Sequence, residues 1–137
     1  MGNTIKLNDG FKVYDIENQH GEIIGQFKIN PTDGKMVGRY NEAIKRLEAV
    51  PKQFEGAEDE IALFVELQEV IEKELLYIVG NDSVKVFFDV MGAFSIIDGQ
   101  LHYEKVLEII GGIINEEGQK RQQAMKQRIK EYGKRYQ

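Results

Sequence analysis

Hydrophobic and polar residues alternate near the start of the chain, and this pattern predicts a β-hairpin spanning residues 11–29. The two strands are expected at 11–16 and 22–29, where apolar side chains occupy every second position. Gly21 lies in the turn between them and can take the positive φ that such a turn needs. A two-stranded sheet is marginal alone, so the hairpin should pack on helices. The alternate residues Ile5 and Leu7 predict an additional short edge strand.

After the hairpin the apolar spacing changes to three and four residues, which predicts helices at about 32–50, 57–79, 83–91 and 101–117. Thr32 or Asn30 is expected to cap the first of these, with Pro31 in or near its first turn. Pro51 should end that helix and begin a linker that runs to Gly56.

The 57–79 segment carries the widest apolar stripe, so it is expected to be a central helix covered on more than one side. Gly80 is placed to cap its C-terminal end. The 83–91 run also fits the alternation of a strand, although a helix is favoured. An Asp98-Gly99 turn should precede the last helix.

The last helix is predicted to continue to about residue 136 in two halves of different character. Its first half completes the core, where Gly111 and Gly112 indicate either a bend or the close approach of another backbone. Beyond residue 117 the sequence is polar and basic. An apolar stripe nevertheless persists there at spacings of four, three and four residues, formed by Met125, Ile129, Tyr132 and Tyr136. Together with Arg121 and Arg128, this stripe is the candidate surface for binding a partner helix or another copy of the chain.

The pattern therefore predicts an α+β fold, in which an N-terminal hairpin packs on a mostly helical bundle and a long C-terminal helix protrudes. Residues 1–117 would form the core domain, and 118–137 a basic amphipathic helix continuing from it. The alternative is that this last segment folds back onto its own domain.

The net charge of −5 is divided unevenly. Residues 119–137 contain seven basic residues, among them Arg121 and Arg128, against the single acid Glu131. The densest block of acids, eight of the 23, lies at 55–74, and Glu58, Glu66 and Glu69 represent that acidic face. An acidic face and a basic tail could attract successive copies of the chain head to tail. They could equally be two solvated helix surfaces.

The residue inventory argues against catalysis. The chain has no cysteine, which excludes disulfides and thiol nucleophiles, and its two histidines, His20 and His102, are predicted to be surface residues. The acids have the spacing of a solvent-exposed helix face rather than of a general acid–base pair in a pocket. No phosphate-binding glycine loop is present. We therefore expect no enzyme activity, metal site or cofactor.

Several segments together resemble a small family of tail assembly chaperones from siphophages and prophages of Gram-positive bacteria. They are Phe-Lys-Val-Tyr-Asp-Ile (11–16), Gly-Glu-Ile-Ile-Gly-Gln-Phe (21–27), Ile-Asn-Pro-Thr-Asp (29–33), Arg39-Tyr40 and the closing helix from Tyr103 to Tyr136. No single motif among them is diagnostic. The N-terminal hairpin is a departure, since the family is mostly helical.

The resemblance implies a non-enzymatic protein of the bacterial host cytoplasm that binds the long tape-measure protein until tail tube protein displaces it. It also implies self-association into a homo-oligomer or open helical array. Two other functions remain open: a small nucleic-acid-binding or regulatory protein that uses the basic helix, and a structural tail or connector subunit of the virion. Neither a nucleic-acid partner nor a membrane is expected, because duplex DNA does not require an apolar stripe and no segment has the length of a membrane span.

Overall fold

The computed structural model describes residues 2–135. Its N-terminal hairpin pairs β1 (Lys12–Glu17) with β2 (Ile23–Ile29) in antiparallel register, as the alternation predicted. Gly21 takes a φ of 79° in the connecting turn. The predicted edge strand was wrong: residues 2–11 form no strand, and Ile5 and Leu7 are 85% and 87% exposed.

The first helix, α1 (Gly34–Leu47), is shorter than predicted and begins at a different cap. The Asp33 carboxylate accepts a hydrogen bond from the Lys35 backbone N–H at 2.9 Å. Asn30 cannot serve there because its side chain accepts from Thr32 and donates to the Asp9 carbonyl oxygen. Pro51 was expected to open a linker, but it lies in the first turn of a second short helix, α2 (Val50–Gln53). Proline suits that position because the N–H that it lacks would have had no partner in the helix.

The central helix, α3 (Glu60–Val79), runs from an Asp59 cap to Gly80, whose φ of 81° closes the helix as predicted. The 83–91 segment is divided into a 3-10 turn, η1 (Asp82–Lys85), and a single α-helical turn, α4 (Val86–Val90). The Asp98-Gly99 turn forms as expected and joins the two-residue strands β3 (Ile96–Ile97) and β4 (Gln100–Leu101).

The last helix, α5 (His102–Arg135), is one unbroken element. Its first half buries Tyr103, Val106, Leu107 and Ile110. Where the glycine pair predicted a bend or an approaching backbone, a side chain approaches instead. The Tyr40 hydroxyl of α1 lies against Gly111 and donates a hydrogen bond to the Leu107 carbonyl oxygen at 3.3 Å.

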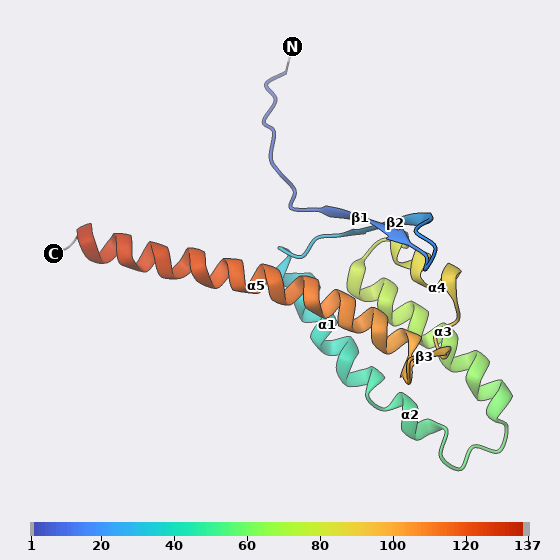
Figure 1. The fold of residues 1–137 in the computed structure, drawn as a ribbon. Helices are drawn as coiled ribbons and strands as arrows, with labels where there is room; N and C mark the ends of the chain where they lie inside the picture. Colours follow the sequence, from blue (N-terminus) through green and yellow to red (C-terminus); the bar gives the residue numbers. More distant parts are fainter. Residues whose placement is uncertain (1, 136–137) are drawn as a thin grey trace.

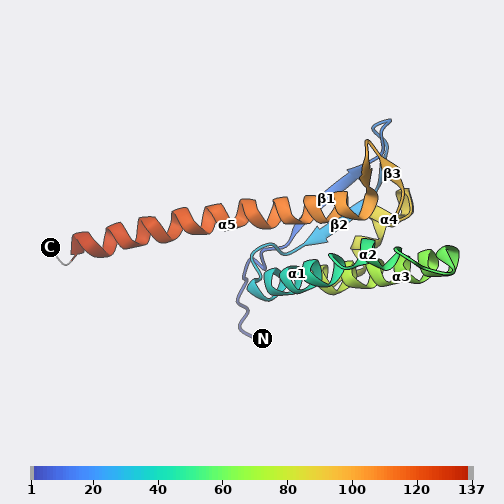
Figure 2. The same ribbon diagram turned by 90° about the horizontal axis from the view of Figure 1, so that it is seen from below.

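These elements form an α+β fold in which the hairpin packs on helices and α5 projects from them. Helices α1 and α3 run side by side, and the inner half of α5 crosses them while the hairpin covers another side (Figures 1 and 2). An edge-to-face contact between Phe27 of β2 and Phe87 of α4, with ring centroids 4.8 Å apart, ties the sheet to the helices. The outer half of α5 extends well beyond this body in both views.

Candidate protein-binding surfaces

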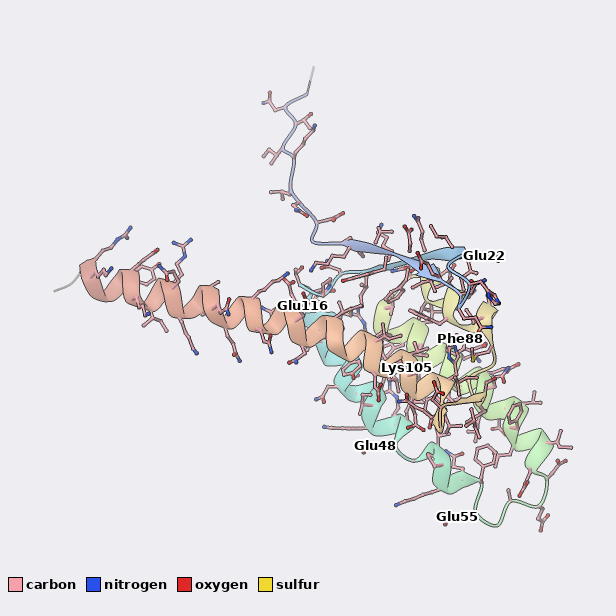
Figure 3. The ribbon with its side chains drawn as sticks, viewed as in Figure 1. Glu22, Glu48, Glu55, Phe88, Lys105 and Glu116 are labelled. Atoms are coloured by element: carbon pink, nitrogen blue, oxygen red, sulfur yellow. The ribbon has the colours of Figure 1, made fainter. Side chains whose placement is uncertain are left out.

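The outer half of α5 is exposed along its whole described length. Glu116 marks the point where the helix leaves the domain (Figure 3). The next residue, Glu117, forms a salt bridge with Lys12 of β1 at 3.5 Å. Every residue from Gln119 to Arg135 is exposed. At 1.5 Å per residue this free part is about 25 Å long. The helix therefore protrudes as predicted, and the alternative in which it folds back is not observed.

An apolar stripe runs along this free part. Met125, Ile129 and Tyr132 are 62%, 70% and 55% exposed and share one helix face. The same face, followed back towards the N-terminus of α5, carries core residues such as Leu107 and Ile110. The stripe is thus a continuation of the core-facing surface into solvent. Tyr136, the last residue of the predicted stripe, lies outside the described residues.

Three arginines lie along one edge of this stripe. Arg121, Arg128 and Arg135 are seven residues apart, so they occupy equivalent positions two turns from one another. Arg128 contacts Glu131 at 3.2 Å, and the Arg135 guanidinium lies 5.9 Å from the centre of the Tyr132 ring. Both contacts are local to the helix, so they do not hold it against the body.

The predicted acidic face is on α3. Glu66 and Glu69 are exposed on that helix, and Glu58 is exposed just before its first turn. The start of α3 and the free end of α5 lie at opposite ends of the molecule (Figures 1 and 2). The acidic face and basic tail of one copy therefore do not meet each other.

The first turns of α3 are apolar, as the stripe predicted, but the sequence did not reveal that they are largely uncovered. Ile61, Phe64 and Val65 are 79%, 42% and 56% exposed, whereas the buried residues of α3 begin at Leu67. The expectation that this helix is covered on more than one side was wrong for its N-terminal part. In these turns only Leu63 packs against the core, and Phe64 contacts Phe94 at the edge, with ring centroids 5.1 Å apart.

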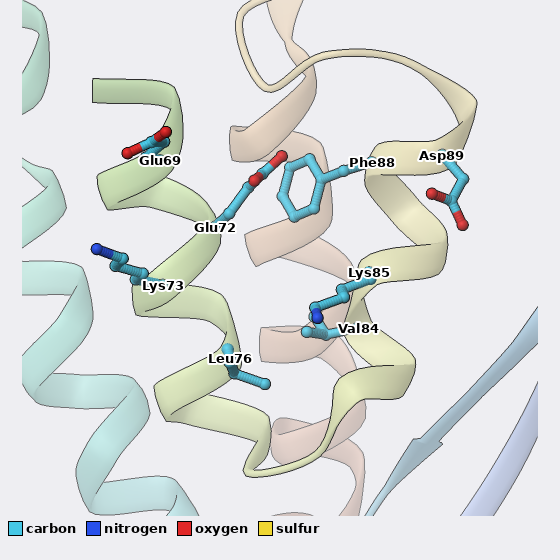
Figure 4. Close-up of a pocket in the computed structure, with 8 residues that line it drawn as sticks. All are labelled: Glu69, Glu72, Lys73, Leu76, Val84, Lys85, Phe88 and Asp89. Carbon is cyan, nitrogen blue, oxygen red and sulfur yellow. The ribbon is translucent and has the colours of Figure 1, made fainter. Parts of the chain in front are cut away.

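A shallow groove lies between α3 on one side and η1 and α4 on the other (Figure 4). It has a volume of about 400 Å³. Leu76, Val84 and Phe88 supply its apolar lining, and charged residues of both signs surround them: Glu69, Glu72, Lys73, Lys85 and Asp89. The groove adjoins the acidic face through Glu69.

The histidines lie apart from these surfaces. His20 is exposed in the hairpin turn, as predicted. His102 is half-buried, and its Nε2 lies 2.6 Å from the Phe87 carbonyl oxygen, so it links α5 to α4 rather than lying free on the surface. Among residues 2–135, no three His, Asp or Glu side chains are grouped closely enough to hold a metal ion.

Comparisons with known proteins return no match. No family model fits this chain, and neither a curated protein nor a solved structure is similar to it. Within the described part of the chain, no helix combines the length and the apolar character needed to cross a membrane.

Proposed function

We propose that this protein is a phage tail assembly chaperone that binds the tape-measure protein and associates with further copies of itself during tail morphogenesis. The observation that carries the proposal is the uncovered stripe of Met125, Ile129 and Tyr132 on a helix that projects from a folded domain. In this proposal the protein acts in the host cytoplasm by binding alone, without catalysis, and tail tube protein later takes its place on the partner.

The chemistry of such a partner suits this surface. A long chain with exposed apolar helix faces aggregates unless another surface covers it. A projecting amphipathic helix can cover such a face by laying its apolar stripe against it. A helix held only at its base can also reach a long partner without its own domain interfering, which favours the free half of α5 over the short groove beside α4.

Self-association is supported by the placement of charge. The acidic face at Glu58, Glu66 and Glu69 and the basic tail lie at opposite ends of the molecule. A contact between the acidic face of one copy and the lysine-bearing side of the next copy's tail, opposite the stripe, joins two different surfaces and leaves the stripe uncovered. Such a contact generates an open or helical array when the rotation does not close a ring.

Co-expression with the tape-measure protein tests the proposal. We expect the tape-measure protein to be soluble and to co-purify only when this chain is present. Ile129→Asp should abolish co-purification, because it places a charge in the centre of the stripe. Gln127→Asp, which adds the same charge on the opposite side of the helix, is the matched control and should retain it. A tape-measure protein whose solubility is indifferent to this chain would contradict the proposal.

Nucleic-acid binding is the second candidate, favoured by the exposure of the basic residues between 119 and 135. Affinity for DNA or RNA would then fall steeply with salt, with a log–log slope set by the number of phosphates contacted. Because the stripe is not needed for phosphate contacts, Ile129→Asp would leave that affinity largely unchanged. The same variant therefore distinguishes the two functions.

A further inference from the structure

The free half of α5 has the register of one strand of a coiled coil. In a heptad written a to g, Met125, Ile129 and Tyr132 occupy successive d, a and d positions. Arg121, Arg128 and Arg135 then fall on three consecutive g positions, and Lys126 falls on e. These are the positions that flank an apolar seam and face the partner helix in coiled coils.

The flanks of this seam carry only positive charge among the described residues. Glu131, the single acid of the tail, falls on a c position, away from the seam. Its ion pair with Arg128 joins side chains that are 71% and 50% exposed, so solvent screens it and Arg128 stays available to a partner. The charge next to the seam is therefore uncompensated within the chain.

This arrangement disfavours pairing between two tails. In a parallel pair in register, each g residue faces the e residue five positions later on the other helix, so Arg121 would approach Lys126 and Arg128 would approach the uncharged Gly133. In an antiparallel pair g faces g, which would bring arginine against arginine. Like charges at these positions oppose association, and opposite charges select the partner.

We infer that the partner of this tail is an amphipathic helix with apolar residues at its a and d positions and acidic residues at its e and g positions. This inference rests on the proposed function and defines the kind of tape-measure segment that the tail accepts. It also assigns separate roles to the two kinds of residue: Met125, Ile129 and Tyr132 supply the contact area, and the three arginines select the partner by charge.

Two synthetic helical probes test this inference on the full-length chain. Both carry about four heptads with leucine and isoleucine at d and a. The acidic probe has glutamate at e and g, and the basic probe has lysine there. Fluorescence anisotropy of each labelled probe with the protein gives the ratio of the two dissociation constants, first at low salt and then at high salt. We expect the acidic probe to be preferred, with the preference diminishing at high salt.

Charge reversal along one edge identifies the residues responsible. The triple variant Arg121→Glu, Arg128→Glu, Arg135→Glu should shift the ratio of dissociation constants towards the basic probe by about tenfold to a hundredfold. The matched control is Lys120→Glu, Lys130→Glu, Lys134→Glu. It makes the same change in net charge on the side of the helix opposite the seam, and it should retain the preference for the acidic probe. Far-ultraviolet circular dichroism of both variants establishes that α5 remains helical.

Each outcome has a separate meaning. Equal shifts in the two triple variants would overturn the inference, because net charge rather than the arginine edge would then decide. Ile129-dependent association of tails in the absence of probe, or duplex DNA competing for the seam, would overturn it as well. Selective binding of the acidic probe by a chain that leaves the tape-measure protein insoluble would refute the proposed function and support the inference. Co-purification of the tape-measure protein without probe selectivity would do the reverse.

Discussion

Alanine substitutions at the neighbouring glycines Gly111 and Gly112 should change stability in opposite directions. Alanine is favoured over glycine in a helix interior by about 1 kcal/mol, so propensity alone predicts the same gain at both positions. The surroundings differ. A Cβ on Gly111 would overlap the Tyr40 hydroxyl and lie 3.2 Å from its Cζ, whereas no atom lies within 4 Å of a Cβ on Gly112.

The loss of stability expected for Gly111→Ala follows from the interactions that Tyr40 would lose. Displacing the ring weakens its hydrogen bond to the Leu107 carbonyl oxygen, worth about 1 kcal/mol, and overpacking adds about 1–3 kcal/mol. After the gain in propensity, Gly111→Ala should lower the free energy of unfolding by about 1–3 kcal/mol. Gly112→Ala should raise it by about 1 kcal/mol.

Urea denaturation followed by circular dichroism measures both changes. Repeating Gly111→Ala in a Tyr40→Phe background should reduce its cost, because phenylalanine lacks the hydroxyl that the new Cβ meets first. If both alanine variants stabilise the protein equally, the contact between α1 and α5 at Gly111 is not as described. The reasoning would also fail if the cost at Gly111 were the same in the Tyr40→Phe background.

Two further predictions concern the tail and the buried phenols. Deletion of residues 118–137 should change the free energy of unfolding by no more than about 0.5 kcal/mol while lowering the assembly state, because the removed helix is exposed. Thermal melting and light scattering measure the two effects, and an unfolded truncated protein would contradict the first. Burial raises the pKa of Tyr40 and of Tyr103, because the folded state favours the neutral phenols. Their contribution to the free energy of unfolding is therefore complete below the unfolded pKa of about 10. It is lost as pH rises through the higher folded pKa. Urea midpoints between about pH 9 and pH 12 should therefore decline, and decline less in Tyr103→Phe.

Local signals in the sequence were sufficient for those parts of the fold that local interactions determine. The hairpin follows from alternation and Gly21, and the end of α3 follows from Gly80, because a positive φ at one residue is a local requirement. The start of α1 was misplaced because several capping residues stand in a row, and a distant contact removes one of them. Asn30 is engaged with Asp9, so Asp33 caps the helix.

Predictions that depended on tertiary packing were less complete. The width of the apolar stripe of α3 indicated a covered helix, but no local signal shows that full burial begins only at Leu67. The glycine pair indicated a close approach, yet only the structure identifies Tyr40 as the group that approaches Gly111. For the candidate binding surface, the helical spacing of its apolar residues predicted the stripe, and the basic residues of the same segment were evident from the sequence. Their separation from the body was also predicted, but only the structure distinguished it from the alternative in which the helix folds back onto the domain.

The energetics of the tail bear on how such a chaperone could work. Full burial of an apolar side chain contributes about 1.5–3 kcal/mol, and Met125, Ile129 and Tyr132 already have part of their surface covered. Their combined contribution is therefore about 3–5 kcal/mol, comparable to or below the cost of about 4–15 kcal/mol for bringing two molecules together. A single tail on a single site would bind weakly and dissociate easily. Copies joined head to tail would present many tails to one long partner, and linkage of this kind can raise the overall affinity by about 10²–10⁴ without any new contact. In the proposed function, self-association and weak individual sites would thus be complementary: the array would retain the partner, while each tail could still be displaced individually.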